Sequence, residues 1–306
     1  MLLDGILPVY KELNLRSTDC VSRVRRLLPK GVKIGHAGTL DSTAEGILLL
    51  LIGRSTRLAD FILSMPKTYK VTINFGVQTS TDDATGDIIA TKNADYLTDE
   101  LIREILPTFL GTKPQIPPSI SAVHVDGKRA HNLARLGANF QILPKNVQIL
   151  HIEQTKKLSD NTAEFLIECK KGTYIRSFAR DLGIALGTVA HVSSLVRLTV
   201  WKFDSSQAIT SKAISDITIQ SLENYILPIG ALCGFISTCG VEVGRELDIK
   251  NGLEIPLTDL KLLSIGQSEI KNKILVIGDN LLSLCNLALK NNIVVASPKC
   301  NIVIDD

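Results

Sequence analysis

Residues 35–52 read GHAGTLDSTAEGILLLLI, a glycine-rich loop followed by an apolar run. The run from Ile47 to Ile52 contains no polar side chain, so we expect it to be a buried core element. Glycines at positions 35, 38 and 46 allow the loop before it to turn tightly and to approach a ligand closely. This arrangement would hold the carboxylate of Asp41 on a loop that is anchored to a rigid core.

Two interpretations of Asp41 are open at this point. An acid on an anchored loop suits a nucleophile or a general base. Alternatively, Asp41 forms a turn or caps a helix, because residues 42–45 (STAE) fit the capping-box pattern. The spacing of the residues favours neither interpretation by itself.

The composition limits the classes of protein that the chain can belong to. Its 306 residues, 45% of them hydrophobic, suit a large domain followed by a small one. No apolar stretch approaches the length of a membrane span, and the start lacks a signal peptide, so we expect a soluble, cytoplasmic protein. The six cysteines form no Cys-x-x-Cys pair, which favours buried free thiols over a disulfide scaffold or a zinc site.

Net charge is only +3, which does not by itself indicate a nucleic-acid-binding protein. Residues 1–230 hold 27 Lys and Arg against 22 Asp and Glu, whereas residues 231–306 hold 7 against 9. A basic segment spans residues 113–145 and has one acid, Asp126; its basic and histidine residues are Lys113, His124, Lys128, Arg129, His131, Arg135 and Lys145. Such a segment fits either a clamp over a polyanion or an ordinary surface insertion.

The hydrophobic pattern predicts a mixture of strands and helices. Period-two alternation indicates strands over residues 67–75 and 162–169, and short Val/Ile-rich strands over 273–278 and 292–297. Helices are predicted over residues 18–28, 55–64, 99–110 and 177–185, with Ser55 and Asp99 as N-caps. Residues 76–86 are rich in Ser, Thr and Asp and are predicted to be a solvated connection. Strands and helices without strict alternation favour an α+β fold, with a domain boundary near residues 227–230.

Several blocks, in order over most of residues 4–202, resemble the TruB-type tRNA pseudouridine synthases. Gly35, His36, Gly38, Leu40 and Asp41 match the family's catalytic loop. The other matches are a tyrosine strand with Lys67 and Tyr69, a basic insertion over residues 115–130, the KGTYIR block at 171–176, and Leu195 with Arg197. Several matches in order are far more specific than any one of them.

The resemblance implies a fold, an activity and a partner. It implies a mixed or antiparallel-sheet pseudouridine synthase domain over residues 1–230, with an RNA-gripping insertion at about 113–145, and a small PUA-like β-domain over 231–306. It implies isomerisation of uridine 55 in the T-arm loop of tRNA after base flipping. It implies no cofactor and no metal, a monomer, and no protein or membrane partner. The alternative is a non-catalytic RNA-binding or tRNA-folding protein with the same fold.

The resemblance also assigns roles to individual residues. Asp41 would be the nucleophile, Arg176 would keep it ionised and aim it, and Tyr69 would pack on the target base. The remaining residues would bind the substrate: His36, Lys128, Arg129, Tyr174, Leu195 and Arg197. Residue by residue, plainer alternatives stay open, since Arg176 could pair with Asp181 or Glu168, and Tyr69 could be an ordinary core tyrosine.

The chain departs from the family pattern in two places. Where the family usually has Asp-Pro-Leu-Ala-Thr-Gly, residues 41–46 read DSTAEG, and losing the proline frees φ at Ser42, so we expect a looser loop. The N-terminal block, usually Lys-Pro-x-Gly-x-(Thr/Ser)-Ser, keeps only Lys11 and Ser17, and Asn14 can supply a left-handed conformation there. Two further alternatives are the same chemistry on another small RNA with a similar hairpin, and a hydrolase. The hydrolase is poorly supported, because the chain has no Gly-x-Ser-x-Gly or P-loop motif.

Overall fold

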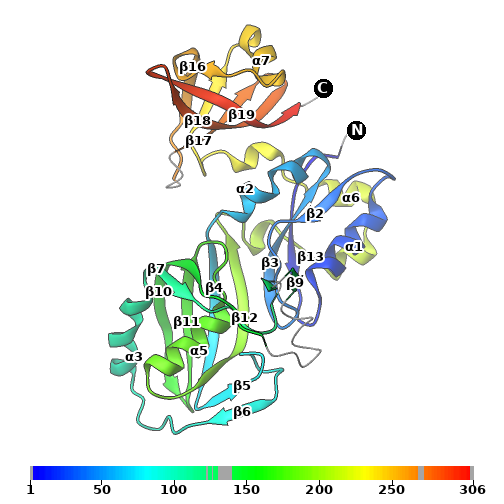
Figure 1. The fold of residues 1–306 in the computed structure, drawn as a ribbon. Coiled ribbons are helices and arrows are strands. Elements are labelled where there is room, and N and C mark those ends of the chain that lie inside the picture. Colours follow the sequence, from blue (N-terminus) through cyan, green and yellow to red (C-terminus); the bar gives the residue numbers. More distant parts are fainter. Residues whose placement is uncertain (1–2, 122, 126, 130–139, 268–271, 304–306) are drawn as a thin grey trace.

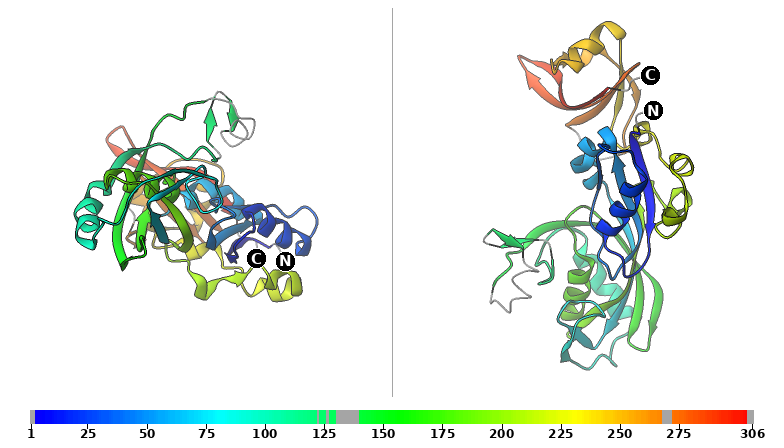
Figure 2. Two further views of the ribbon diagram at one scale, coloured as in Figure 1. Left: turned by 90° about the horizontal axis from the view of Figure 1, so that it is seen from below. Right: turned by 90° about the vertical axis from the view of Figure 1, so that its right-hand side faces the viewer.

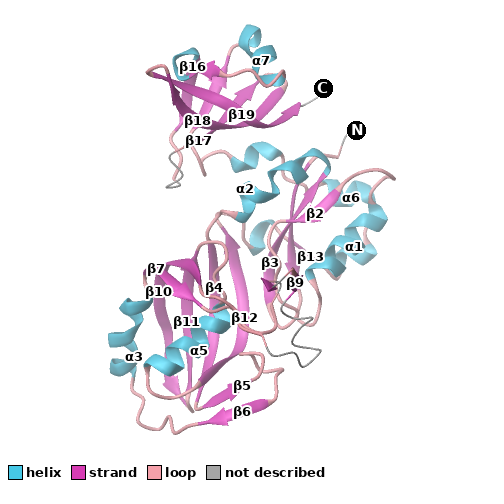
Figure 3. Cartoon of the chain, in the orientation of Figure 1, coloured by secondary structure: helices cyan, strands magenta, loops and turns pink. Residues whose placement is uncertain are grey.

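The computed structural model describes residues 3–121, 123–125, 127–129, 140–267 and 272–303 (Figure 1). It contains a nine-stranded mixed sheet and a six-stranded sheet, with helices packed around them (Figure 3). The predicted α+β class is confirmed. The helices are α1 (Ser17–Leu27), α2 (Ala59–Leu63), α3 (Asp99–Ile105), α5 (Ile175–Ala185), α6 (Ile219–Glu223) and α7 (Val243–Lys250).

The large sheet places the glycine-rich loop beside its centre. Its strands, in spatial order, are β13 (Ile209–Thr210), β1 (Gly5–Lys11), β3 (Glu45–Ile52), β12 (Ala190–Val200), β4 (Lys67–Phe75), β11 (Thr162–Cys169), β10 (Lys145–Ser159) and β7 (Gly111–Gln115), and β2 (Ile34–His36) also pairs with β3. The loop of residues 37–44 therefore connects two neighbouring strands, β2 and β3. The start of β3 touches β12 in parallel, at residues 45 and 46.

The apolar run of residues 47–52 lies in strand β3, and all six residues are buried. Its side chains alternate between two apolar clusters: Ile47, Leu49 and Leu51 pack on one face of the sheet, and residues 48, 50 and 52 pack on the other. Because both faces are covered, the strand shows no polar alternation in its sequence. The prediction of a buried core element is confirmed.

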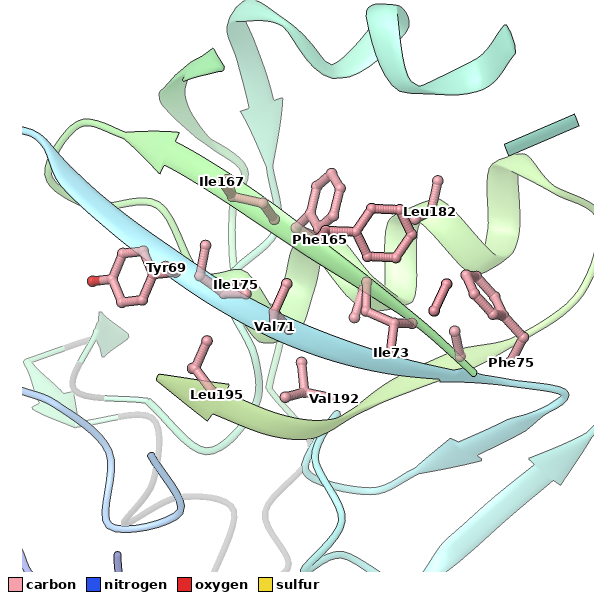
Figure 4. Close-up of a cluster of buried hydrophobic side chains, with 14 of the residues drawn as sticks. Tyr69, Val71, Ile73, Phe75, Phe165, Ile167, Ile175, Leu182, Val192 and Leu195 are labelled. Carbon is pink, nitrogen blue, oxygen red and sulfur yellow. The ribbon is translucent and has the colours of Figure 1, made fainter. Parts of the chain in front are cut away.

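Strands β4 and β11 lie side by side in the large sheet and have the bounds that the alternation predicts. Their apolar faces meet helix α5 in a cluster that includes Val71, Phe165 and Leu182 (Figure 4). Tyr69 lies at one end of this cluster, with its hydroxyl pointing away from the other apolar side chains. The sheet and α5 thus form a rigid base for the residues at that end.

Both predicted N-caps are wrong, although the helix predicted to start at residue 99 does start there. Residues 53–58 form a 3-10 helix before α2, and Ser55 lies inside it, with its hydroxyl donating to the carbonyls of Gly5 and Ile52. The N-cap of α3 is Thr98, whose hydroxyl accepts a hydrogen bond from the Leu101 amide. Asp99 is instead the first residue of the helix, and its carboxylate accepts from the Leu158 amide on β10.

The prediction that residues 76–86 form a solvated connection is also wrong in part. Strands β5 (Val77–Thr79) and β6 (Ile88–Thr91) form a hairpin, and Thr79, Asp82 and Asp83 are buried. The segment folds back on the large sheet because the Val192 amide donates to the Asp82 carbonyl at 3.0 Å. It therefore brings acidic side chains into the protein rather than into solvent.

The second sheet is built from residues 238–303. Its strands, in spatial order, are β15 (Ile255–Pro256), β19 (Ile293–Val303), β18 (Leu281–Lys290), β17 (Lys273–Gly278), β14 (Thr238–Val241) and β16 (Leu260–Ser264). The predicted strand at 273–278 is β17, and the one at 292–297 belongs to the longer β19. The boundary near residues 227–230 stays a prediction; those residues lie between β13 and β14.

Part of the basic segment forms a short hairpin of β8 (His124–Val125) and β9 (Lys128–Arg129). This hairpin stands clear of the large sheet in both views of Figure 2. His131 and Arg135, which belong to the same basic segment, lie outside the described residues. In the part of the chain that the structure describes, no helix is long and apolar enough to cross a membrane.

Candidate functional site

The loop that carries Asp41 is a tight turn rather than the start of a helix. The Ala44 amide donates to the Asp41 carbonyl at 3.1 Å, and strand β3 begins at Glu45. Gly38 and Gly46 adopt φ values of 105° and 113°, which are available to glycine and strained for other residues. No helix follows Asp41, so the capping-box interpretation does not hold.

Asp41 forms an ion pair with Arg176, which lies in the first turn of α5. Arg176 Nε lies 2.9 Å from Asp41 Oδ2, and Nη2 lies 2.8 Å from the same oxygen. The Arg176 side chain is only 6% exposed, whereas that of Asp41 is 43% exposed. Arg176 also donates to the carbonyls of Thr81 and Ile120, at 2.9 and 3.0 Å. The guanidinium is therefore fixed in the protein and holds an acid that is open to solvent.

The alternative partners of Arg176 are excluded by these contacts. Asp181 pairs with Arg180 at 3.0 Å, and Arg180 also pairs with Asp82 at 2.9 Å. Glu168 lies on β11, beside Thr68 of β4. Arg176 is thus tied to the loop that carries Asp41 rather than to Asp181 or Glu168.

A pocket of about 260 Å³ opens beside this ion pair. It gathers six of the nine residues that the resemblance singled out: Asp41, Tyr69, Tyr174, Arg176, Leu195 and Arg197. They come from three strands or helices and from the loops before β3 and α5, which are far apart in the sequence. The structure therefore brings together residues that the sequence could only place in separate blocks.

Tyr69 and Leu195 form an apolar wall of the pocket, on neighbouring strands β4 and β12. Both side chains are largely buried, and Figure 4 shows them side by side, with the Tyr69 hydroxyl pointing out of the apolar cluster. Burial raises the pKa of the Tyr69 phenol above its ordinary value, so the hydroxyl is neutral at neutral pH. The wall can therefore present a flat aromatic ring and one neutral donor to a ligand.

Arg197 lies beneath the pocket and is only 1% exposed. Its Nε donates to the Ile47 carbonyl at 2.6 Å, while Nη1 and Nη2 lie 3.4 and 3.3 Å from the carbonyls of Thr39 and Gly38. These contacts fasten the loop of residues 37–44 to β12. The geometry favours a loop-positioning role for Arg197 over the substrate-binding role that the resemblance implies.

Tyr174 is the residue before α5 and stands at the rim of the pocket. Gln115 of β7 holds its backbone from both sides: the Tyr174 amide donates to Oε1 at 2.9 Å, and Nε2 donates to the Tyr174 carbonyl at 3.2 Å. Burial, and next the negative charge of Asp41, raise the pKa of the Tyr174 phenol. Gln115 thus sets the position at which the helix with Arg176 begins.

Three predicted residues are His36 on β2 and Lys128 and Arg129 on a hairpin outside the large sheet. His36 is half-buried on β2, and its Nδ1 has no hydrogen-bond partner within the described part of the chain. Burial, followed by the charge of Arg197, lowers the pKa of His36, which keeps the imidazole neutral at neutral pH. Lys128 and Arg129 lie on β9, in the hairpin that stands clear of the sheet. The roles that the resemblance gives these three residues stay predictions.

The N-terminal block supports the Asp41 loop from below. Lys11 is fully buried, and its Nζ donates to the Ala44 carbonyl at 2.5 Å and to the Leu15 carbonyl at 2.8 Å. Ser17 Oγ binds both the amide and the carbonyl of Leu40, at 2.9 and 3.0 Å. Asn14 adopts φ 65°, which confirms the expected left-handed conformation. The two retained residues of this block are therefore structural supports of the loop.

Sequence reasoning gave no role to two further residues at the site, Lys67 and Asp83. Lys67 lines the pocket, and its Nζ donates to the carbonyls of Leu63 and Met65 at 2.7 and 2.6 Å. Burial, and then the charge of Arg197, lower the pKa of Lys67 to about 8. Asp83 Oδ2 lies 3.9 Å from Arg176 Nε. Asp83 lies in the polar segment of residues 76–86, and its burial depends on a fold-back that composition does not reveal.

The site holds no group of three His, Cys, Asp or Glu side chains that could bind a metal ion, and neither does any other described part of the chain. All six cysteines are free thiols. Around the pocket, the described residues include a carboxylate (Asp41), a fixed guanidinium (Arg176) and a neutral phenol (Tyr69).

A protein-family model for the "TruB family pseudouridylate synthase (N terminal domain)" matches residues 25–175. A second, for the "tRNA pseudouridylate synthase B C-terminal domain", matches residues 176–233. A protein of Ehrlichia ruminantium (strain Gardel) named tRNA pseudouridine synthase B is 38% identical over 266 residues, which are 85% of this chain and 88% of that protein. The chain belongs to the TruB family.

Other TruB relatives support this assignment. A tRNA pseudouridine synthase B of Synechocystis sp. is 38% identical over 84% of this chain and 86% of that protein. Membership of the TruB family makes the chain a pseudouridine synthase, which is an isomerase. The TruB models cover the Asp41 loop, the tyrosine strand and the arginine helix, so the pocket lies within the matched region.

Solved structures agree on the fold. A chain in the crystal structure of a Cbf5–Nop10–Gar1 complex matches with a TM-score of 0.73 and 20% identity, over 98% of this chain and 85% of that chain. A chain of an archaeal box H/ACA sRNP Nop10–Cbf5 complex matches with a TM-score of 0.70 and 18% identity, over 98% of this chain and 86% of that chain. At these identities the likeness concerns the fold alone, including the C-terminal β-rich domain of this TruB protein.

Proposed function

We propose that this TruB protein converts uridine 55 in the T-arm loop of tRNA to pseudouridine, with Asp41 as the nucleophile. The observation that carries the proposal is the Asp41–Arg176 ion pair at a pocket walled by Tyr69 and Leu195. An ionised, accessible carboxylate next to an aromatic wall is what the rearrangement of a nucleoside requires. The tRNA substrate is carried over from the names of the relatives.

Asp41 must remain ionised in order to react with a sugar carbon. Both contacts from Arg176 fall on Oδ2 of Asp41. The geometry therefore leaves Oδ1 as the oxygen that can approach C1′ of the ribose, while Oδ2 stays anchored.

The reaction exchanges one glycosidic bond for another. Asp41 Oδ1 attacks C1′, the N1–C1′ bond breaks, and its electron pair leaves with the uracil. The uracil turns within the pocket, C5 bonds to C1′, and the carboxylate leaves C1′. The proton on C5 is then lost to a base, and N1 takes up a proton, so that product and substrate are isomers. A route through a glycal would use the same carboxylate, as the base that removes a sugar proton.

The pocket wall would hold the uracil while its bond to the sugar is broken. The ring of Tyr69 offers a flat face to the base, and Leu195 beside it excludes water. Because the phenol is neutral, it can donate a hydrogen bond to the base. This arrangement suits a base that must turn without leaving the site.

The target uridine has to leave the RNA stack to reach this pocket, at a cost of a few kcal/mol. We propose that His36, neutral and half-buried on β2, occupies the vacated position, and that Lys128 and Arg129 hold the phosphate backbone. The proposal also includes a monomeric state and a cytoplasmic location. Its two domains are residues 1–230 and residues 231–306, and the second is PUA-like. No protein or membrane partner is part of the proposal.

The proposal is tested with a tRNA transcript that carries tritium at C5 of uridine. C5 loses its hydrogen only when it becomes the glycosidic carbon, so the released tritium measures the amount of pseudouridine formed. We expect release from the wild-type transcript and none from a transcript with cytidine at position 55. Equal release from both transcripts would contradict uridine 55 as the target. Tight binding without any release would favour the non-catalytic RNA-binding alternative.

A further inference from the structure

We infer that Thr43 is a positioning residue for Asp41, and that its hydrogen bond to Asp83 supplies the loop constraint that a proline supplies at position 42 in the family pattern. This chain has Ser42 and Thr43 where that pattern has Pro and Leu. Thr43 Oγ1 donates to Asp83 Oδ2 at 3.1 Å. The inference rests on the proposed function, since it assumes that Asp41 is the group that must be positioned.

The two oxygens of Asp83 serve different neighbours. Oδ1 accepts from Thr81 Oγ1 at 2.7 Å, from the Thr85 amide at 3.0 Å and from Thr85 Oγ1 at 2.6 Å. Oδ2 accepts from Thr43 and lies 3.9 Å from Arg176 Nε. The bonds to Oδ1 therefore fix the carboxylate, and Oδ2 joins the altered loop to the arginine that holds Asp41.

These contacts form a closed circuit through the site. Asp41 and Thr43 lie two residues apart in one loop; Asp41 is bonded to Arg176, Thr43 is bonded to Asp83, and Arg176 faces Asp83. A displacement of the loop would have to break the Thr43 bond or the Asp41 ion pair. Thr43 thus acts on Asp41 by limiting where the loop can go.

The backbone bonds of the same loop do not include Thr43. The Asn14 amide donates to the Ser42 carbonyl at 2.8 Å, and Lys11 Nζ donates to the Ala44 carbonyl. Within the part of the chain that the structure describes, the bond to Asp83 is the hydrogen bond that holds Thr43 itself. Ser42 is exposed, so the residue at the position of the missing proline does not replace its constraint.

The acceptor of this bond is a charged group. Burial raises the pKa of the Asp83 carboxyl, but the hydrogen bonds from Thr85 and Thr81 and the charge of Arg176 outweigh it, so the pKa lies below its ordinary value. Asp83 is therefore ionised at neutral pH, and the Thr43 bond is charge-assisted. Bonds of this kind are stronger than those between two neutral groups.

Two measurements test the inference. The first is the single-turnover rate of tritium release from T-arm RNA at saturating enzyme, and the second is the dissociation constant for the RNA. We expect Thr43→Val, which keeps the shape and removes the hydroxyl, to lower the rate by about 10-fold. The RNA affinity should stay within about 2-fold, because Thr43 does not contact RNA in this scheme. Thr43→Ser, which restores the hydroxyl, should recover most of the rate.

Two further variants separate positioning from general loosening. Thr108→Val removes a hydroxyl bond to the Ile105 carbonyl, outside the contacts of the Asp41 loop, and should change the rate by less than about 2-fold. Adding Ser42→Pro to Thr43→Val should raise the rate again, because the ring fixes φ. An active wild type with an equally active Thr43→Val would overturn the inference alone, whereas a wild type without release would overturn the proposed function.

Discussion

At the scale of single residues, the site depends on one contact between groups that lie 135 residues apart in the chain, Asp41 and Arg176. Arg176 makes four contacts at once: two to Asp41 Oδ2 and one each to the carbonyls of Thr81 and Ile120. A planar guanidinium can meet such a set of acceptors, and a lysine ammonium cannot. Arg176 therefore acts through its geometry as well as its charge.

Replacing Arg176 with lysine should separate these two contributions. We expect Arg176→Lys to lower the single-turnover rate by about 100-fold or more, because a shift of Asp41 by 1 Å has effects of that size. The dissociation constant for tRNA should rise by less than about 5-fold, since the charge is kept. Rapid-quench tritium release and filter binding measure the two quantities. Equal losses in both would make Arg176 a binding residue instead.

Lys67 should make the free energy of unfolding depend on pH. Its pKa is lowered from 10.5 to about 8 in the folded protein, so burial disfavours the charged form. Between pH 8 and 10.5 the unfolded chain binds more protons than the native state, and the free energy of unfolding should rise with pH. Relative to Lys67→Met, the wild type should gain up to about 3 kcal/mol across this interval.

Urea unfolding of the wild type and Lys67→Met at pH 7.5 and pH 10 measures this gain. Groups that titrate equally in both proteins cancel in the difference between their unfolding free energies. The lost hydrogen bonds to Leu63 and Met65 contribute a nearly constant offset. A difference that does not change with pH would contradict the lowered pKa of Lys67.

At the scale of strands and helices, the sequence predicts the elements whose pattern is local. Alternation in β4 and β11 reflects one buried face, so both sets of bounds are correct. The N-caps predicted at Ser55 and Asp99 are wrong, because Ser55 bonds to the Gly5 carbonyl from inside a 3-10 helix and Thr98 caps α3. Motif matches gathered six pocket residues, but Thr43 and Asp83 needed the fold-back of residues 76–86, which is a tertiary contact.

The junction of the Asp41 loop with β3 depends on a glycine. A Cβ on Gly46 would lie 2.2 Å from the Arg197 carbonyl, and its φ of 113° strains other residues. We expect Gly46→Ala to destabilise the protein by several kcal/mol, about 3 or more, and to abolish activity. Gly172→Ala is the matched control, because its φ is also positive (87°) but no atom lies within 4 Å of the added Cβ.

Circular dichroism melts and tritium release on both variants check this prediction. Gly172→Ala should cost only about 1 to 2 kcal/mol, which is the strain of a left-handed residue. A larger loss of stability in Gly46→Ala would show that the close approach to β12 matters beyond the backbone angle. Equal losses in the two variants would refute the steric argument.

At the scale of the whole molecule, the two sheets share an apolar cluster. Phe61 of α2 and Trp201 after β12 both stack edge-to-face on Phe235, with ring centroids 5.5 and 5.3 Å from it. Leu275 of β17 and Leu282 of β18 belong to the same cluster. The second sheet is therefore packed against the part that carries the pocket, rather than joined to it by a linker alone.

Truncating Phe235 should weaken this packing. We expect Phe235→Ala to cost about 3 to 5 kcal/mol and to let the second sheet melt at a lower temperature than the large sheet. Scanning calorimetry would then show two transitions where the wild type shows one. Leu289→Ala is a suitable control, because Leu289 lies on β18 but is exposed. A single transition at an unchanged temperature in Phe235→Ala would mean that the cluster does not couple the sheets.

The central claim is that Asp41, held by Arg176, breaks the glycosidic bond of uridine in tRNA. The most direct test compares tritium release from C5-labelled tRNA by the wild type and by Asp41→Asn, which keeps the shape of the side chain but removes its charge. We predict release by the wild type and a rate at least about 1,000-fold lower for Asp41→Asn, with tRNA binding retained. Release by Asp41→Asn at the wild-type rate would contradict the claim.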